Sequence, residues 1–381
     1  MLSFSFYDPL WISDAHLFDA GEDLASFSYS TLALGGYWSA DLTLIQPIHR
    51  LEEWRARGLG RRVEIAAGPS IVWEGFVNTV EAEVSGYPQT IGPYLDIINR
   101  AKLVFSAIDT SGATPVTGLR LETAWLNDLN SQAQYGILQD VFSAGGVALN
   151  VADSLLAGLL RRRRHPPRSE DLTLQADPPP KFVRIKLGLV GYARLMEKYI
   201  YRQTTNTGLT TASAKVALLV QADPNGVLRL GALDPNALAV PGWENDDAQA
   251  WSILKGILAQ GDGALNRWTF GIYAGRRANY GPVTEEISYV RPLREGRGFL
   301  TNAQGNAIEG WEVVPGRYVL VEDLAPGRPL ATNLEDDPRI LFAETVQVRG
   351  EGSEISSVVI NGAHTYKIER RLAQLGLGGI G

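Results

Sequence analysis

The amino-acid sequence predicts an α+β, β-rich fold in which strands dominate both ends of the chain and mixed α/β material lies between them. Two stretches, before residue 110 and after residue 226, contain repeated runs of Val, Ile, Trp and Phe separated by Gly, Pro and Asn turns, which is typical of short strands. The longest run, residues 71–84, contains Gly75. Because an interior glycine marks a bulge or a sharp bend, we expect this sheet to curl into a barrel.

The first 110 residues contain the order strand, strand, short helix, strand, long strand. The expected elements are strands at 27–33 and 37–45, a helix at 47–57, and strands at 62–66 and 71–84. Pro47 suits a helix start, and Ile48, Leu51 and Trp54 form one apolar stripe at spacings of three. The turn at residues 67–70 joins the last two strands into a hairpin.

Residues 111–225 predict an intervening mixed α/β domain. A polar loop at 109–118 marks its start, and the turn DPNG at 223–226 marks its end. The expected elements are a helix at 124–142 interrupted at Gly136, a helix or strand at 151–160, a strand at 182–189, a helix at 191–201 and a strand at 215–221.

Residues 226–381 predict a C-terminal, β-rich and barrel-like domain. Its helix, 245–260, has acidic residues at its start, an apolar stripe that includes Trp251 and Leu254, and Gly261 beyond its end. The expected strands are at 267–273, 286–290, 311–314, 317–321, 345–348, 356–360 and 364–368. Together with an N-terminal barrel at 1–110, the chain is therefore divided into 1–110, 111–225 and 226–381.

Composition and charge exclude several classes of protein. The 381 residues include no cysteine, which excludes disulfides, thiolate metal sites and a cysteine nucleophile. The four histidines have no metal-site spacing, and neither GxSxG nor a phosphate-binding GxxxxGKS/T motif occurs. No window of 18 uncharged apolar residues predicts a membrane span, and a net charge of −7 argues against a protein that coats nucleic acid. We therefore expect no enzyme activity, no cofactor and no metal.

One basic cluster interrupts this acidic chain. It consists of Arg161, Arg162, Arg163, Arg164 and Arg168. One interpretation is a patch that binds nucleic acid or phosphate. The alternative is a solvated loop or a contact to an acidic neighbouring subunit, and it is favoured because no aromatic or glycine-rich binding surface is interleaved.

Carboxylates and tryptophans leave two other functions open. A carboxylate-dependent cell-wall hydrolase could use one of five acidic pairs: Glu52/Glu53, Glu81/Glu83, Asp246/Asp247, Glu285/Glu286 or Asp336/Asp337. Directly adjacent residues on a strand point to opposite faces, which disfavours most of these pairs. A module that binds glycans or a host receptor could use exposed residues among the nine tryptophans, although their periodic positions favour core or interface roles.

The stretch GGYWSADLTL, a short helix and GRRVEIAAGPSIVWEGFVNTVE together resemble the N-terminal barrel of tailed-phage, siphophage-like baseplate or tail-tip hub proteins. The hairpin reads G-x-x-V-x-I-x-x-G-x-x-x-V-W-E-G-x-V from Gly60 to Val77. The continuations GPYLDIINRAKLVFSAIDTS and TAWLNDLNSQAQYG are similar in texture, so the resemblance covers residues 25–140.

The resemblance implies a structural virion protein that forms a ring-shaped hub, usually a homotrimer, with two tube-type antiparallel β-barrel domains per chain. Such a ring joins the tail tube to the tip and lines the DNA channel. The implied partners are further copies of the chain, the tail tube, the distal tail protein, a tip fibre or spike, and DNA that passes without specific binding. The implied location is the virion tail, assembled in the host cytoplasm. An acidic channel would repel DNA phosphates and let the genome slide.

Overall fold

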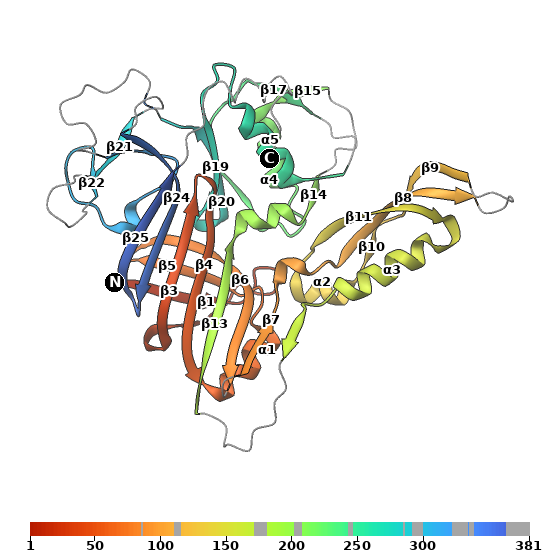
Figure 1. The fold of residues 1–381 in the computed structure, drawn as a ribbon, viewed down its shortest axis with the longest axis horizontal. Helices are drawn as coiled ribbons and strands as arrows, with labels where there is room; N and C mark the ends of the chain where they lie inside the picture. The colour runs from red at the N-terminus through yellow and green to blue at the C-terminus, as the bar shows by residue number, and fades with distance from the viewer. Residues whose placement is uncertain are drawn as a thin grey trace.

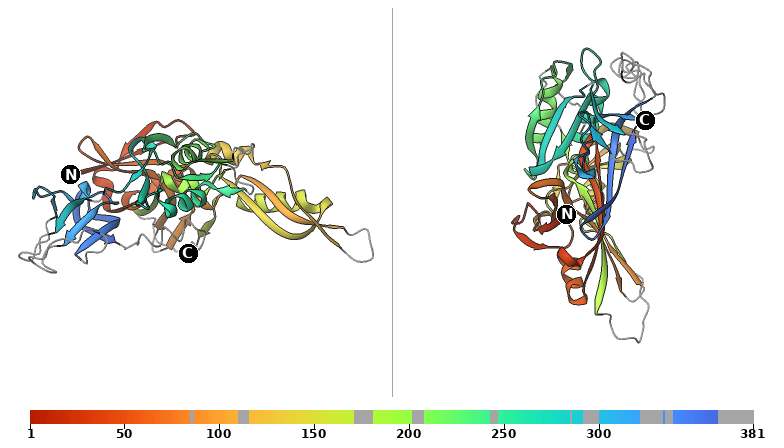
Figure 2. Two further views of the ribbon diagram at one scale, coloured as in Figure 1. Left: turned by 90° about the horizontal axis from the view of Figure 1, so that it is seen from above. Right: turned by 90° about the vertical axis from the view of Figure 1, so that its left-hand side faces the viewer.

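The computed structural model describes residues 1–84, 87–109, 116–170, 181–201, 208–242, 247–284, 286–291, 300–321, 334 and 339–362. A body built around one large curled sheet carries an arm, residues 97–168, that projects from it (Figure 1). Figure 2 shows the same projection from above the view of Figure 1. The predicted α+β, β-rich class is confirmed.

The core of the body is an antiparallel succession of nine strands. In pairing order they are β2 (His16–Asp19), β1 (Leu2–Tyr7), β5 (Arg62–Ala67), β6 (Ser70–Val84), β13 (Phe182–Gly191), β4 (Leu34–Pro47), β3 (Leu24–Leu32), β24 (Ile340–Glu351) and β25 (Glu354–Gly362). The far end of β6 also pairs with β7 (Tyr87–Ile91), which pairs in turn with β12 (Arg168–Glu170). Strands far apart in the sequence, β13 and β24, therefore complete a sheet that the N-terminal residues begin.

Alternating side chains explain how these strands form one core. In β13, Val183, Ile185 and Leu187 are buried, whereas Arg184 and Lys186 between them are exposed. The 3-10 turn η2 (Ile48–Arg50) and helix α1 (Leu51–Arg57) connect β4 to β5, and α1 buries Leu51 and Trp54. The helix expected at 47–57 is thereby confirmed.

The main sheet is strongly curled but is not a closed barrel in the described part of the chain. The rings of Phe4 and Phe27, from β1 and β3, lie 5.1 Å apart, although four strands, β5, β6, β13 and β4, separate β1 from β3 in the pairing order of the sheet. The Leu2 amide also donates a hydrogen bond of 3.0 Å to the Ser353 carbonyl at the β24–β25 turn. The two tube-type barrels remain a prediction.

Gly75 permits a close approach of two strands. It lies in β6 opposite both Val63 of β5 and Gly191 of β13. A Cβ atom at this position would lie 2.3 Å from the Val190 carbonyl oxygen. The register shifts of β6 lie on either side of Gly75, one against β5 and one against β13, so the glycine marks close packing between two irregularities.

The arm has its own sheet and its own small core. Its elements are β8 (Arg100–Asp109), β9 (Val116–Glu122), β10 (Leu126–Asn127), α2 (Leu129–Tyr135), β11 (Gln139–Ala148), the 3-10 turn η4 (Leu149–Val151) and α3 (Ala152–Arg163). β8 is central, with β11 parallel on one side and β9 and β10 antiparallel on the other. α3 packs on this sheet through Leu156 and Leu160, which share a core with Leu103 and Phe105.

Most of the remaining helices and strands lie in the upper part of the body in Figure 1, whereas short 3-10 turns occur throughout the chain. The short turns are η1 (Gly21–Asp23), η3 (Tyr94–Asp96), η5 (Tyr192–Glu197), η6 (Ala274–Arg276) and η7 (Gly310–Glu312). The helices are α4 (Ala212–Gln221) and α5 (Ala250–Gln260). The strands are β14 (Ile200–Tyr201), β15 (Leu209–Thr211), β16 (Arg229–Leu233), β17 (Ala239–Pro241), β18 (Ala248–Gln249), β19 (Trp268–Tyr273), β20 (Arg277–Pro282), β21 (Ile287–Arg291), β22 (Thr301–Asn302) and β23 (Tyr318–Val321). β19 joins the start of β4, and β23 joins β24.

Several element predictions are wrong. The strand expected at 215–221 is helix α4, and the helix expected at 124–142 is the short α2 followed by strand β11. The strand expected at 311–314 overlaps the 3-10 turn η7, and the helix expected at 191–201 is limited to the 3-10 turn η5. The helix expected at 245–260 begins at Ala250. Residues 243–246 and the strand expected at 364–368 lie outside the described residues.

Three hydrophobic cores organise the described residues. The largest contains residues from Leu2 to Val348, the second belongs to the arm, and a small third one joins Ala33 to Tyr318 and Phe342. The largest core draws on all three predicted ranges, and the division at 110 and 225 stays a prediction. No helix among the described residues is long and apolar enough to span a membrane.

Candidate functional surfaces

The arginine cluster lies at the root of the arm. Arg161, Arg162 and Arg163 are exposed in the last turn of α3, where cations interact favourably with the helix dipole. Arg168 is exposed at the start of β12. Among the described residues, none of these four guanidinium groups has a carboxylate partner. The structure thus places Arg161, Arg162 and Arg163 in the last turn of α3 and Arg164 directly after it, whereas Arg168 lies on β12.

Arg164 has a structural role that separates it from the other four. Its Nη1 atom lies 3.0 Å from Oδ2 of Asp128. Asp128 also caps α2, because its Oδ1 accepts a hydrogen bond of 2.9 Å from the Ser131 amide. This hydrogen bond and the Arg164 guanidinium lower the pKa of Asp128. Arg164 therefore fixes the end of α3 against α2.

Two asparagines, one from the arm and one from the body, hold the segment that leads into β11. Asn99 is fully buried and bonds Gly136 and Leu138: its Nδ2 donates to the Gly136 carbonyl at 2.7 Å, and its Oδ1 accepts from the Leu138 amide at 2.9 Å. Asn225, in the turn after α4, bonds Ile137 between them. Because each side chain satisfies one donor and one acceptor of the backbone, the segment 136–138 is held from both sides.

A buried charge network joins the N-terminal hairpin to the η6 turn. Glu74 of β6 is 1% exposed and accepts a hydrogen bond of 2.8 Å from the Gly275 amide. Its Oε1 lies 3.5 Å from Nη1 of Arg276 and 3.6 Å from Nη1 of Arg62. Burial raises the pKa of Glu74, against the opposing effect of Arg276. Arg62 also pairs with Asp14 at 2.7 Å, so the network ties three distant segments together.

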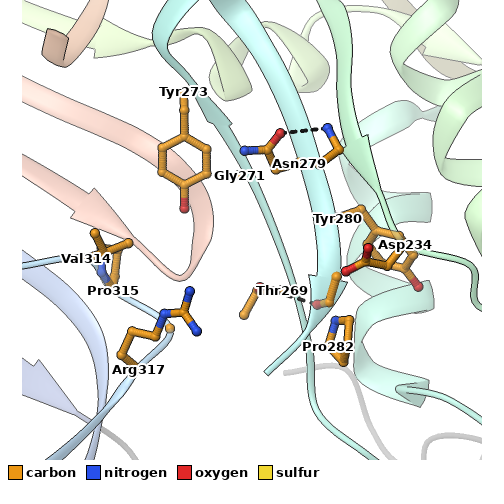
Figure 3. Close-up of a pocket in the computed structure, with 13 residues that line it drawn as sticks. Asp234, Thr269, Gly271, Tyr273, Asn279, Tyr280, Pro282, Val314, Pro315 and Arg317 are labelled. Carbon is orange, nitrogen blue, oxygen red and sulfur yellow. Dashed lines mark hydrogen bonds between the residues drawn. The ribbon is translucent and has the colours of Figure 1, made fainter. Parts of the chain in front are cut away.

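A polar hollow of about 330 Å³ opens between β19, β20 and the segment Val314–Arg317. Figure 3 shows the Tyr273 hydroxyl and the Arg317 guanidinium directed into it, with Asp234 on the opposite wall. Burial raises the pKa of Tyr273 to about 12, so the phenol stays protonated at neutral pH. Arg317 donates a hydrogen bond of 3.3 Å to Thr284 outside the hollow. The lining holds donors and acceptors for a polar group, but its residues form no hydrogen-bonded pair of nucleophile and base.

The other predicted candidates are not assembled into a site by the described residues. Glu52 pairs with Arg55, Glu53 with Arg50 and Arg61, and Glu81 with Lys186. The side chain of Glu83, and the residues Asp246, Glu285, Asp336 and Asp337, lie outside the described set. The described residues contain no group of three or more His, Asp or Glu side chains placed to hold a metal ion.

All eight described tryptophans are buried or half-buried. Trp54, Trp73, Trp251 and Trp268 are buried, and Trp11, Trp38, Trp125 and Trp311 are half-buried. The half-buried rings of Trp38 and Trp125 are covered by the guanidinium groups of Arg194 and Arg100. The expected core role is confirmed for the four buried tryptophans, and an interface role for the others stays a prediction.

Sequence patterns did not single out Asn99, Asn225 or Glu74. Each is an isolated polar residue whose importance depends on partners far away in the chain. The one available signal was the predicted turn 223–226, which contains Asn225. Asp223 of the same turn accepts hydrogen bonds from the amides of Val227 and Leu228 and thereby fixes the turn.

Comparison with solved structures finds phage tail proteins and a secretion component. The chain is similar to a tail protein from Neisseria meningitidis MC58, with 9% identity, a TM-score of 0.41 and coverage of 97% of this chain and 99% of that chain. It is similar to the 43 kDa tail protein of prophage MuSo2 from Shewanella oneidensis, with 7% identity, a TM-score of 0.43 and coverage of 97% and 98%.

A third similar structure is an E. coli component of the type VI secretion system, described as structurally similar to bacteriophage T4 tail proteins. The identity is 10%, the TM-score is 0.36, and the coverage is 91% of this chain and 77% of that chain. All three TM-scores lie below 0.5, so these similarities do not establish a shared function. No protein-family model and no curated protein matches the chain.

Proposed function

We propose that this chain is a non-enzymatic structural protein of a phage tail, a baseplate or tail-tip hub. In this proposal three copies form a ring that joins the tail tube to the tip and surrounds the DNA channel. Its partners are then further copies of itself, the tail tube and distal tail proteins above, and a tip fibre or spike below. Its place is the tail of the virion, after assembly in the host cytoplasm.

The observation that carries the proposal is the N-terminal element order. The residues that resemble tail-tip hub proteins, including the hairpin from Gly60 to Val77, read as strand, strand, short helix, strand, long strand. The same order is present as β3, β4, α1, β5 and β6. These elements are consecutive in sequence and form the centre of the main sheet, so the part of the chain that carries the resemblance also organises the body.

Charge and shape also favour a subunit of an assembly. The net charge of −7 suits a wall past which DNA phosphates must slide without binding. The arm extends from the body (Figure 1). It exposes both apolar and basic side chains, and exposed apolar surface of this kind is typical of a protein–protein contact. A receptor-binding module is less well supported, because each described tryptophan is buried or half-buried.

The mass of the purified protein in solution tests the proposal. Native mass spectrometry should give a trimer of the 41.5 kDa chain, and electron micrographs of the same sample should contain rings with a central opening. A chain that stays monomeric at all concentrations, both alone and after mixing with its phage's tail tube protein, would contradict the hub. Trimers without a central opening would contradict the channel.

A further inference from the structure

Helix α3 has a second apolar face that the chain leaves exposed. Ala152, Leu156 and Leu160 form the inner stripe and are buried against the arm sheet. Val151 and Leu155 begin an outer stripe at the same spacing of four and are 46% and 40% exposed. Half-buried Leu159 and exposed Arg162 continue it. A helix that is apolar on two faces is normally buried on both, but the outer stripe has no partner among the residues that the structure describes.

Strand β9 carries two further exposed leucines of the arm. Leu121 lies opposite Phe105 in the arm sheet, and paired residues share a face, so Leu121 is on the face that α3 covers. Leu119 precedes it by two residues. Leu119 is 82% exposed and Leu121 38% exposed. We call the surface formed by Val151, Leu155, Leu159 and Arg162 the outer arm face.

Charge distinguishes the arm from the rest of the chain. Residues 97–168 contain eight Lys and Arg and five Asp and Glu, which gives the arm a formal charge of +3. Because the net charge of the whole chain is −7, the residues outside the arm carry −10. Within the arm, Arg164 is paired with Asp128. Arg161, Arg162 and Arg163 have no partner among the described carboxylates; Arg162 belongs to the outer arm face, and the other two lie beside it in the same helical turn. The outer arm face therefore combines apolar area with uncompensated positive charge.

We propose that the outer arm face docks on the acidic body of a second copy of this chain. The partner must offer an apolar surface and negative charge, and the body of the same chain, at −10, has the complementary sign. The arm projects away from its own body, so the contact is made between copies (Figure 2). An arm on a body is a head-to-tail contact, and such contacts generate a ring when the rotation closes. This inference rests on the proposed ring and specifies how its subunits meet.

A pair of adjacent substitutions on α3 tests the apolar part. Leu155→Glu places a charge in the outer stripe, whereas Ser154→Glu adds the same charge at the neighbouring exposed position outside it. We expect Leu155→Glu to raise the dissociation constant of the assembly about tenfold or more, and Ser154→Glu to leave it within about twofold, measured by sedimentation. Equal circular dichroism melting curves establish that both variants fold. Equal assembly of both variants would overturn the proposal.

Reversal of charge tests the basic part. The double variant Arg161→Glu, Arg162→Glu should weaken assembly and should also reduce its salt dependence between about 0.05 and about 0.5 M NaCl, because the attraction it removes is screened by salt. The contrasting charge reversal is Arg55→Glu, on helix α1 of the body, where Arg55 pairs with Glu52. It makes the body more acidic and should therefore not weaken assembly. A double variant that assembles with unchanged affinity and unchanged salt dependence would overturn the electrostatic contact.

A photo-crosslinking side chain at position 155 identifies the occupant. In the assembled wild-type background, crosslinks to residues outside 97–168 of another copy support the proposal. Crosslinks to the arm of the other copy, or to no other copy, overturn it. If the wild-type chain forms no assembly at all, the proposed ring itself fails. If it assembles and the arm variants assemble equally well, only the docking of the arm fails, so the two failures are distinguishable.

Discussion

The side chain of Asn225 hydrogen-bonds both polar backbone groups of Ile137. Its Oδ1 accepts from the Ile137 amide at 2.6 Å, and its Nδ2 donates to the Ile137 carbonyl at 3.0 Å. The two residues are 88 positions apart. Ile137 belongs to the segment that enters β11, whereas Asn225 belongs to the turn that follows α4. One side chain therefore takes the role of a neighbouring strand at the junction of arm and body.

Asn225→Ala should loosen this junction. It removes two hydrogen bonds and leaves two backbone groups of Ile137 without their partner, so we expect a loss of about 2 kcal/mol of stability. Hydrogen exchange should become faster at the Ile137 amide. At amides in the centre of the arm sheet, the exchange rate should change less. Asn130→Ala, at an exposed position of α2, is the control. Unchanged exchange at Ile137 would show that the hydrogen bonds do not hold the arm.

The sequence predicts the N-terminal strands well because their pairing is local. The hairpin of β5 and β6 is joined by a short turn, and β3 and β4 are also neighbours in the chain. Hydrophobic periodicity and the residues of the turn are sufficient to predict most strand pairs of this kind. The closing strands of the same sheet, β13 and β24, were also predicted as strands, at 182–189 and 345–348. No local pattern indicates that they pair with β4, β6 and β3.

The wrong elements have physical reasons of the same kind. The predicted helix at 124–142 ends at Gly136, whose φ of 70° is outside the helical region, and the residues after it pair in parallel with β8. Parallel pairing is non-local and cannot be read from periodicity. Helix α4 contains β-type residues but is buried at Val216 and Leu219, and Thr211 caps its start. A short buried helix and a buried strand look alike in sequence.

The sequence identified the arginine cluster as a group, but it did not predict the position of these residues in the fold. Composition alone identified Arg161–Arg163, whereas their position at the end of a helix depends on the packing of Leu156 and Leu160. The outer stripe of α3 was hidden for another reason. In a sequence, exposed and buried leucines are identical, and only the arm sheet decides which stripe faces inward.

Gly75→Ala should destabilise the main sheet strongly. The added methyl group would lie 2.3 Å from the Val190 carbonyl oxygen, which belongs to the backbone of β13 and cannot move without disturbing the pairing. We expect a cost of about 3 kcal/mol, at the upper end for overpacking. Gly145→Ala is the matched control, because a Cβ there meets no atom within 4 Å. Similar urea midpoints for the two variants would contradict the close approach.

Leu156→Ala and Leu155→Ala should differ although the two residues are adjacent. Leu156 is 1% exposed in the arm core, so its truncation should cost about 3 kcal/mol. Leu155 is 40% exposed, and its truncation should cost under about 1 kcal/mol in the monomer. Hydrogen exchange at the amides of Leu103 and Phe105 measures the stability of the arm. Equal acceleration in both variants would contradict the assignment of inner and outer stripes.

Glu74 should make stability depend on pH in a defined direction. Its ordinary pKa is 4.5, and burial raises that value in the folded chain despite Arg276, the Gly275 amide and Arg62, with Glu64 adding to the rise. Between 4.5 and the raised pKa, the folded state therefore binds more protons than the unfolded state at this group. The contribution of Glu74 to the free energy of unfolding must then decrease as pH rises through this window, by at most about 1.4 kcal/mol per pH unit.

Glu74→Gln tests this sign, because glutamine keeps an acceptor for the Gly275 amide but cannot titrate. We expect thermal midpoints of the wild-type chain to include a decrease with rising pH above 4.5 that the variant lacks. Glu81→Gln removes a more exposed carboxylate from the same strand, where it pairs with Lys186, and serves as the control. If Glu74→Gln retains the full pH dependence of the wild type, the pKa of Glu74 is the same in the folded and unfolded states. The favourable interactions with Arg62 and Arg276 would then offset the effect of burial on that pKa completely.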